Sequence, residues 1–267
     1  MLITSKENPN IKTLTKLLSG KKYRNEMGVF VVEGMRNCVD VVKQANEKKT
    51  EIVWAFYTEE SLENYKKSLD VTCISELDEN KKFCITKEIA DKISLEDNNQ
   101  GIFVVAKKLD LEFSKENLDE KGKYVVLNHL QDPGNVGTLL RTADAVGADG
   151  VVLTGNCCDL YNPKVVRSAM GSMGRIKIYV EDDFSRVCNT LSELGIKTLA
   201  AVIKNGVSVT EYDFDKPCAV VIGNEGNGLS ESDADMCDDK ITIRMNGNID
   251  SLNAAVAGAI ILWEMFR

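Results

Sequence analysis

Apolar runs alternate with amphipathic stretches along the first hundred residues. The apolar positions of residues 8–18 recur at helical spacing and predict a helix there. Runs rich in Val, Ile and Phe predict strands at VFVVEG (29–34), EIVWAFY (51–57) and GIFVVAKK (101–108). Helical patterns fall at residues 35–45, 61–69 and 86–93, and a short apolar stretch, VTCI, at 71–74. Strands that alternate with helices predict an α/β domain.

A second series of apolar runs follows in the same alternation. The predicted strands are YVVLN (124–128), GVVLT (150–154), RIKIYV (175–180), KTLAAVI (197–203), PCAVVIG (217–223) and KITIRM (240–245). Helical patterns lie between them, after the turn at 132–135 and at residues 164–170, 184–194 and 251–266. This order predicts a mostly parallel sheet. The last helix is apolar nearly all round, so we expect it to be buried against protein or a second subunit.

A composition change separates the two series. Residues 109–123, LDLEFSKENLDEKGK, are polar and highly charged, as linkers often are. We therefore predict an N-terminal α/β domain at 1–107, a linker at 108–123 and a larger α/β domain at 124–267.

Charge is distributed unevenly along the 267 residues. The formal net charge of −8 argues against nucleic-acid binding if it is taken globally. Residues 1–50, however, hold ten Lys and Arg against five Asp and Glu. The cations Lys21, Lys22 and Arg24 of the GKKYR stretch predict contacts to an RNA backbone, which needs local positive charge. A solvated helix face remains the alternative.

Few residues are available for metal chemistry. The eight cysteines contain no C-x-x-C pair, and His129 is the one histidine, so we expect no metal site. We expect most of the cysteines to be buried, where cysteine behaves as a small apolar residue. The sequence has no apolar run long enough to span a membrane and no secretory signal at residues 1–10, so a cytoplasmic protein is expected.

Three loops rich in Gly and Asn follow predicted strands of the second domain. They are DPGNVGTLLRTADAVG (132–147), VVIGNEGNGLS (220–230) and IRMNGNIDSLNAAVA (243–257). Open α/β sheets bind ligands at the carboxyl ends of their strands, so the loops predict a site there. The second loop has G-x-x-G-x-G spacing, which is not the dinucleotide-binding pattern, and no G-K-[ST] indicates a P-loop.

Single residues in these loops have ordinary structural explanations. Ser251 is a plausible N-cap of the last helix, and Asn253 in its first turn could serve the backbone or a ligand. Arg141 follows Asn135 by six residues, close to two helical turns, so both can face the same end of the sheet. His129 adjoins the first loop, where packing at a strand end is favoured over a role as a general base.

The three loops together resemble motifs one, two and three of the SpoU (TrmH) family of RNA ribose 2′-O-methyltransferases, in the family's order. FVVEGMR (30–36) and NNQGIFVVAK (98–107) resemble the substrate-binding domain that often precedes the catalytic domain in this family. The resemblance implies a parallel sheet with a deep trefoil knot and a homodimer. It also implies an N-terminal fold like that of ribosomal RNA-binding proteins.

The resemblance also implies a site. The methyl donor, S-adenosyl-L-methionine, would lie among Gly223, Ile243 and Leu252, near the backbone of Asn224, Glu225 and Met245. The catalytic residues implied are Asn135, Arg141, Glu225, Ser251 and Asn253. An arginine is almost always charged, so we expect Arg141 to anchor phosphate and stabilise the developing alkoxide, with direct base action as the alternative. Glu225 would orient Arg141 or polar ligand groups.

The segment NPKVVRSAMGSMGR (162–175) resembles a family segment near the RNA entrance. Lys164 and Arg167 are expected there as phosphate contacts, with ordinary surface charge as an equal alternative. The predicted function is 2′-O-methylation of a ribose in RNA, with ribosomal RNA favoured because of the separate N-terminal domain. The alternatives are a tRNA 2′-O-methyltransferase, a non-catalytic RNA-binding or ribosome-assembly protein, and a base methyltransferase. The intact first motif argues against the last.

Overall fold

The chain forms two compact units. The computed structural model describes residues 2–47, 49–65, 72–96 and 98–267. The first unit comprises Met1–Leu109 and Tyr161–Gly174, and the second comprises Asp110–Leu160 and Arg175–Arg267. The segment Tyr161–Gly174 therefore packs with the first unit, although it lies between two strands of the second.

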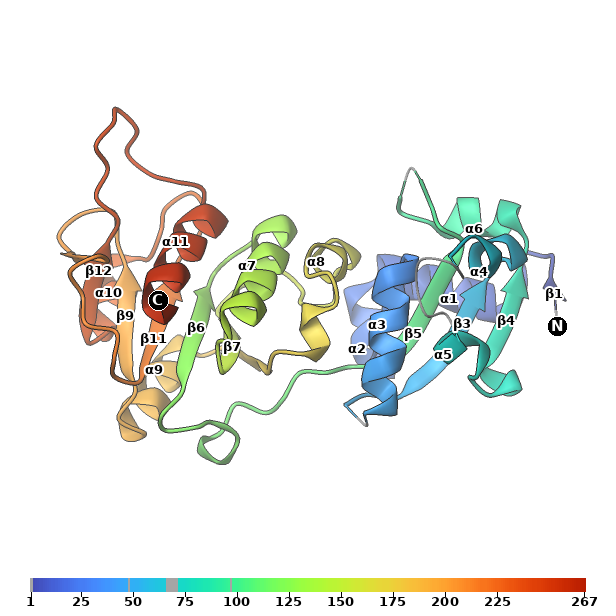
Figure 1. The fold of residues 1–267 in the computed structure, drawn as a ribbon, viewed down its shortest axis with the longest axis horizontal. Coiled ribbons are helices and arrows are strands. Elements are labelled where there is room, and N and C mark those ends of the chain that lie inside the picture. The colour runs from blue at the N-terminus through green and yellow to red at the C-terminus, as the bar shows by residue number, and fades with distance from the viewer. Residues whose placement is uncertain (1, 48, 66–71, 97) are drawn as a thin grey trace. The chain divides into compact units, whose positions relative to one another are not determined.

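A mixed five-stranded sheet forms the centre of the first unit (Figure 1). Its strand order is β1 (Leu2–Ile3), β4 (Lys82–Ile85), β3 (Ile52–Tyr57), β5 (Ile102–Lys107) and β2 (Val29–Glu33). Strand β5 runs antiparallel to both of its neighbours, and β1, β4 and β3 are parallel. The predicted strands at 29–34, 51–57 and 101–108 are confirmed. The short strands β1 and β4 were not predicted.

Helices cover both faces of this sheet. Helices α1 (Pro9–Ser19) and α6 (Lys87–Ile93) share one apolar cluster with the sheet, and α3 (Met35–Asn46) packs against β2 and β5 together with α5 (Thr72–Ser75). The remaining helices are α2 (Lys21–Met27), α4 (Glu59–Tyr65) and the 3₁₀ turn η1 (Glu79–Lys81). Residues 66–69 of the predicted helix at 61–69, and Val71 of VTCI, lie outside the described residues.

The segment Tyr161–Gly174 contains α8 (Pro163–Ser168) and the 3₁₀ turn η3 (Ser172–Gly174), and it packs beside β2. The buried Tyr161 ring lies with its centroid 4.9 Å from that of Phe30, and the Tyr161 hydroxyl accepts a hydrogen bond of 2.6 Å from Leu109 N. Gln44 Nε2 on α3 donates to Gly171 O over 3.1 Å. These contacts attach the segment to the first unit.

The second unit contains a seven-stranded sheet in which all strand pairs are parallel, which confirms the predicted α/β class. The strand order is β10 (Val207–Ser208), β12 (Asp239–Thr242), β9 (Lys197–Ala201), β11 (Cys218–Ile222), β6 (Lys123–Asn128), β7 (Gly150–Thr154) and β8 (Ile178–Glu181). The continuous Val- and Ile-rich runs are explained by helices on both faces, which leave β7 and β11 wholly buried.

Helices α7 (Pro133–Val146) and α11 (Ala254–Phe266) pack together on one face of this sheet (Figure 1). Helix α9 (Phe184–Glu193) joins the apolar cluster on the other face, where α10 (Glu231–Met236) contacts it; a 3₁₀ turn, η2 (Lys115–Asn117), precedes β6. Gly258 permits the close approach of α11, since a Cβ there would lie 2.4 Å from Leu139 Cδ2. None of the helices in the described ranges is long and apolar enough to cross a membrane.

Candidate active site

The start of α7 fixes the first element of the site. The Asp132 side chain accepts a hydrogen bond of 2.9 Å from Asn135 N and caps the helix, and Pro133 occupies the first helical position. These roles explain the Asp-Pro-Gly-Asn sequence, because Asp and Pro both favour a helix N-terminus. Asn135 is thereby held in the first turn, with 8% of its surface exposed.

Three side chains from three separate loops form a chain of hydrogen bonds. Asn253 Nδ2 donates to Asn135 Oδ1 over 3.1 Å, and Asn135 Nδ2 donates to Glu225 Oε1 over 3.2 Å. The Asn135 amide is therefore held at both ends. The structure brings Asn135, Glu225 and Asn253 together as the combined loops predicted.

Glu225 accepts further hydrogen bonds from the segment that leads into α7. Its two carboxylate oxygens accept from Asp132 N over 2.8 Å and from Gln131 N over 3.2 Å. Partial burial opposes ionisation, but these backbone donors and the Asn135 amide lower the pKa of Glu225 below its ordinary value. Glu225 is thus an ionised acceptor that orients Asn135 and the approach to α7.

The glycine-rich loop after β11 folds back on itself. Asn224 N donates to Gly228 O over 3.0 Å, and Gly228 N donates to Asn224 O over 2.9 Å. The Asn224 side chain accepts from Gly226 N and donates to His129 O. A Cβ on Gly223 would lie 2.3 Å from Leu229 N, so glycine is required there by the returning chain itself.

His129 is held by its neighbours. Its Nδ1 accepts a hydrogen bond of 3.0 Å from Asn156 N, and its backbone is left-handed with φ 58°. Its ring lies against Gly155, where a Cβ would come within 2.7 Å of Cε1. These contacts favour the structural interpretation of His129 over a role as a general base.

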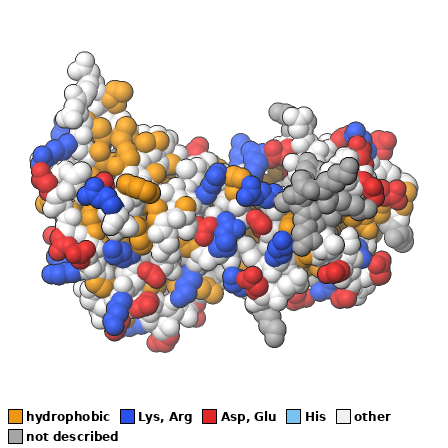
Figure 2. Space-filling view, in the orientation of Figure 1, with side chains coloured by type: hydrophobic (Ala, Val, Ile, Leu, Met, Phe, Trp, Pro, Cys, Tyr) orange, Lys and Arg blue, Asp and Glu red, His pale blue; other side chains and the backbone are white. Residues whose placement is uncertain are grey.

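A groove between α7 and α11 contains the remaining polar side chains. Asn135, Thr138, Arg141 and Asn253 line it, together with apolar side chains of α11. Figure 2 shows hydrophobic side chains gathered on the face that carries α11. Arg141 is exposed and lines the same groove as Asn135 and Asn253.

The expected N-cap of the last helix was wrong. Helix α11 begins at Ala254, and Asn253 caps it by accepting from Ala255 N and Val256 N over 2.9 and 3.2 Å. Ser251 lies exposed two residues earlier and takes no part in the chain of hydrogen bonds to Glu225. Asn253 therefore both caps the helix and contacts the site.

The segment between β12 and α11, residues 243–253, is exposed to solvent over most of its length, and we call it the open segment. Residues 244–251 are all exposed, including Met245 at 36% and Ile249 at 70%, and Ile243 and Leu252 are half-buried. The glycine loop is hydrogen-bonded, whereas Ile243 and Leu252, the apolar residues expected beside the donor, keep part of their surface exposed to solvent.

The predicted RNA contacts divide into two kinds. Lys21, Lys22 and Lys164 are exposed, and Arg167 is exposed but forms an ion pair with Glu96. Arg24 is 3% exposed, and its Nη1 donates to Leu17 O over 2.6 Å. The expectation that Arg24 contacts RNA is therefore wrong, because its guanidinium is used inside the unit.

Asn128, which no sequence pattern singled out, supports the site from behind. Asn128 Nδ2, at the end of β6, donates to Asp233 Oδ2 on α10 over 3.0 Å. The signal was present as Ser230-x-x-Asp233, a helix-start pattern in which Ser230 Oγ accepts from Asp233 N over 3.0 Å. Within the described ranges, no three His, Cys, Asp or Glu side chains gather as metal ligands would.

Comparison with known proteins finds a family match for each of the two parts of the chain. Residues 122–263 match the SpoU rRNA Methylase family, and residues 8–104 match the MRM3-like substrate binding domain.

Full-length relatives carry related descriptions. The chain is 27% identical over 263 residues to the 23S rRNA (guanosine(2553)-2′-O)-methyltransferase RlmP of Bacillus subtilis, and covers 98% of both chains. It is 29% identical to a Synechocystis protein named as an uncharacterized tRNA/rRNA methyltransferase, over 99% of this chain and 93% of that one. A crystal structure of an AdoMet-bound rRNA methyltransferase from Sinorhizobium meliloti superposes with a TM-score of 0.84 at 26% identity, covering 99% and 97% of the two chains.

Proposed function

We propose, on the premise that the chain belongs to the SpoU rRNA methylase family, that it methylates a ribose 2′-hydroxyl of ribosomal RNA with S-adenosyl-L-methionine as the donor. The observation that carries the proposal is the chain of hydrogen bonds from Asn253 through Asn135 to Glu225, beside Arg141. It unites all three family motifs at one end of a parallel sheet. The intact set argues against a vestigial, non-catalytic domain.

Ribosomal RNA is favoured as the substrate because a relative named for rRNA matches this chain over nearly its full length. The Bacillus relative, named for 23S rRNA, aligns over 98% of both chains, so the substrate-binding part is included. The description of the Synechocystis relative covers both tRNA and rRNA, so a tRNA substrate is an outcome that the test must separate.

The residues assigned to the donor fit such a group in two respects. The loop at Asn224–Gly228 is already folded, and the apolar side chains of Ile243, Met245 and Leu252 retain exposed surface that a ligand could cover. When bound, S-adenosyl-L-methionine supplies an electrophilic methyl group on its sulfonium.

Arg141 is the electrostatic residue of the proposed site. A ribose hydroxyl becomes more negative as its oxygen attacks the methyl carbon and its proton leaves. A guanidinium remains protonated at any working pH, so Arg141 stabilises that charge or holds the adjacent phosphate. Proton abstraction by Arg141 itself is the less favoured alternative.

Asn135, Asn253 and Ser251 are proposed to position the ribose. The Asn135 amide is fixed between Asn253 and Glu225, so its position is established before RNA arrives. Glu225 keeps its negative charge because backbone N–H groups point at it, which suits an orienting acceptor. Ser251 would join from the open segment.

RNA delivery is assigned to the first unit. Lys21 and Lys22 on α2, and Lys164 with Arg167 on α8, are exposed cations of this unit. Contacts to phosphate need no base recognition, so these residues would add affinity and orientation.

A homodimer is proposed from the uncovered face of α11. Val256 is 48% exposed, Ile260 37% and Trp263 66%, on a helix whose other side is buried. Contiguous exposed apolar side chains of this kind mark interaction sites. The same groove holds Arg141, so a second copy docked there would lie next to the active site.

The trefoil knot and the cytoplasmic location also remain proposals. The strand order supports a threaded C-terminus. Strand β12 is separated from β11 by β9 in the sheet. The chain that leaves β12 nevertheless returns to form α11, which packs on α7 and β11. This return crosses the carboxyl edge of the sheet.

The proposal is tested with purified full-length protein, methyl-labelled S-adenosyl-L-methionine and ribosomal RNA from cells that lack the gene. A methylated 2′-oxygen blocks alkaline cleavage of the next phosphodiester, so we expect label in alkali-resistant dinucleotides. Label on a base, label in tRNA only, or no label would each contradict the proposal.

A further inference from the structure

The first unit contains a pocket of about 340 Å³ with an apolar floor and a polar rim, and all of its lining residues belong to that unit. Leu18 and Val31 are buried in the floor, and Leu95 stands 56% exposed at the mouth. One water occupies roughly 30 Å³ in the liquid. The pocket therefore has room for a flat heterocycle of about ten heavy atoms.

Glu33 lines this pocket, and hydrogen bonds hold its carboxyl group in place. Its Oε1 accepts from Ser94 Oγ, and its Oε2 accepts from Leu95 N over 3.4 Å. Burial raises the pKa of Glu33, although these donors and the nearby Arg167 charge oppose the shift. A carboxylate has about four acceptor positions, so each oxygen of Glu33 keeps capacity for one more donor.

The rim of the pocket carries cations. Arg167 is engaged with Glu96, whose backbone N donates to Ser94 Oγ over 3.0 Å, and this pair holds the wall beside Leu95. Lys164 is exposed and forms no ion pair with another described residue. Lys164 is therefore the cation at this rim that can take an incoming phosphate.

We propose that this pocket binds an unpaired guanine of the RNA substrate, with its Watson–Crick edge on Glu33, its face on Leu95 and its phosphate at Lys164. Guanine presents two neighbouring donors, N1–H and the exocyclic amino group, which match one acceptor on each carboxylate oxygen. Adenine and cytosine pair one donor with a ring acceptor, and uracil flanks its single donor with two carbonyls. Each of these bases would turn an acceptor towards Glu33.

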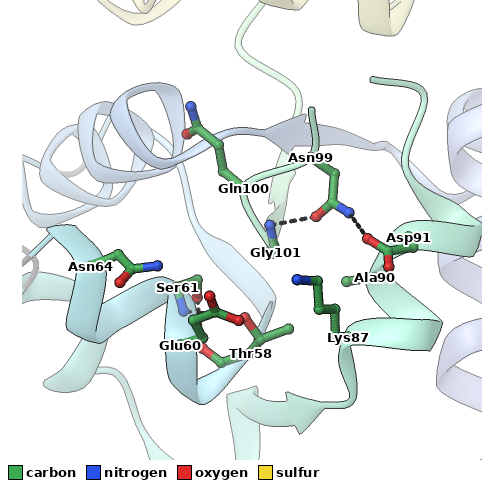
Figure 3. A pocket seen from close by; sticks show the side chains of 10 residues that line it. All are labelled: Thr58, Glu60, Ser61, Asn64, Lys87, Ala90, Asp91, Asn99, Gln100 and Gly101. Carbon is green, nitrogen blue, oxygen red and sulfur yellow. Dashed lines mark hydrogen bonds between the residues drawn. The ribbon is translucent and has the colours of Figure 1, made fainter. Parts of the chain in front are cut away.

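A second pocket of the same unit differs in the hydrogen bonds that its Asp91 carboxylate makes (Figure 3). Two carboxylates line it, that of Glu60 and that of Asp91. The Asp91 carboxylate accepts from Asn99 Nδ2, and Asn99 Oδ1 accepts from Gly101 N over 2.6 Å. That carboxylate is used to hold the chain before β5. Lys87 also lines this pocket, and it provides a matched cation for comparison with Lys164.

The inference rests on the proposed function, because it treats the guanine as part of the RNA substrate, but it is tested by binding alone. The probes are fluorescent heptanucleotides, UUUGUUU and its versions with adenine or inosine at the centre, titrated into the full chain. One charge-assisted hydrogen bond corresponds to about tenfold or more in affinity, so guanine should bind that much more tightly than adenine. Inosine, which lacks the amino group, should lie between them.

Substitution of the pocket residues sharpens the test. Glu33→Gln keeps an acceptor for Ser94 or Leu95 but loses the charge and one acceptor oxygen, so the preference for guanine should disappear. Lys164→Ala should weaken all three probes alike, and Lys87→Ala should leave them unchanged. A thermal melt shows whether Glu33→Gln is folded, and the inosine comparison in the unaltered protein needs no variant.

Equal affinity for guanine and adenine, or a guanine preference that survives Glu33→Gln, would overturn the inference. Methyl transfer without guanine preference contradicts the pocket alone. Guanine preference without methyl transfer contradicts the proposed function alone.

Discussion

Two loops at the carboxyl edge of the second sheet, one after β11 and one after β12, have similar sequences and different structures. Both are rich in Gly and Asn, as GNEGNG (223–228) and NGN (246–248). The first is closed by two backbone hydrogen bonds between Asn224 and Gly228 and by the Asn224 side chain. In the second, residues 244–251 are all exposed.

The first loop is held by its own backbone hydrogen bonds, whereas the second is exposed along its length. A loop whose N–H groups already have partners loses little conformational freedom when a ligand binds, whereas an open segment must be ordered at that moment. We therefore expect the loop after β11 to give the site its geometry and the segment after β12 to close over the ligand. Composition alone could not separate these roles.

The largest effect is expected at Gly223. In Gly223→Ala the new Cβ would meet backbone atoms, Leu229 N at 2.3 Å and Gly228 C at 2.4 Å, so the loop must move. A displacement of about 1 Å at such a site costs about 10²-fold, and we expect at least that loss in both donor affinity and methyl transfer. Titration calorimetry with S-adenosyl-L-methionine measures the first.

The matched control is Gly247→Ala in the open segment, where a Cβ meets nothing within 4 Å. Donor affinity should change by less than about threefold, since the added methyl group displaces no neighbouring atom, and stability should change by about 0.5 kcal/mol or less. Equal losses in the two variants would show that the loops do not differ in preorganisation.

Arg141→Ala comes next, because it leaves both loops intact. Methyl transfer should fall by about 10² or more, as for the loss of one preorganised charged group, while donor affinity is retained. Single-turnover kinetics at saturating donor measures the step. Arg186→Ala on α9, whose guanidinium pairs with Glu181 at 3.0 Å, is the surface control. Near-normal transfer by Arg141→Ala would remove Arg141 from the mechanism.

Asn253 ends the open segment, caps α11 and donates a hydrogen bond to Asn135 on α7. Two substitutions separate these functions. Asn253→Asp keeps the acceptor that caps α11 but cannot donate to Asn135, so transfer should fall about tenfold at unchanged Tm. Asn253→Ala should lose transfer and also about 1 kcal/mol of stability with the cap. If both variants melt alike, the capping role is wrong.

The smallest effect is expected from Ser251→Ala. Because Ser251 is exposed and does not cap α11, Tm should not change. Loss of one neutral hydrogen bond to the ribose corresponds to about three- to tenfold in transfer efficiency. A lowered Tm would mean that Ser251 supports the helix after all.

Much of the second unit could be predicted from its sequence, because strands buried on both faces give continuous apolar runs. Asn135, Glu225 and Asn253 could be grouped because parallel strands bring their carboxyl ends to one edge. The choice between Ser251 and Asn253 as the cap could not be made, since both residue types cap helices and they stand two positions apart.

The first unit shows why the rest could not be predicted. Arg24 has the sequence context of a surface cation, and only the folded chain brings the carbonyl of Leu17 to its guanidinium. Strands β1 and β4 are too short to give a periodic signal. The pocket at Glu33 depends on Lys164 and Arg167, which are more than a hundred residues away in sequence.

The return of Tyr161–Gly174 to the first unit has a consequence for synthesis on the ribosome. Phe30 leaves the ribosome long before Tyr161, its ring partner, so at 5–20 residues per second the interval is on the order of ten seconds. During that time the flank of β2 is an uncovered apolar surface while strands of the second unit emerge. A nascent chain in this state would need protection by chaperones, and a fragment ending at residue 109 would keep the exposed flank permanently.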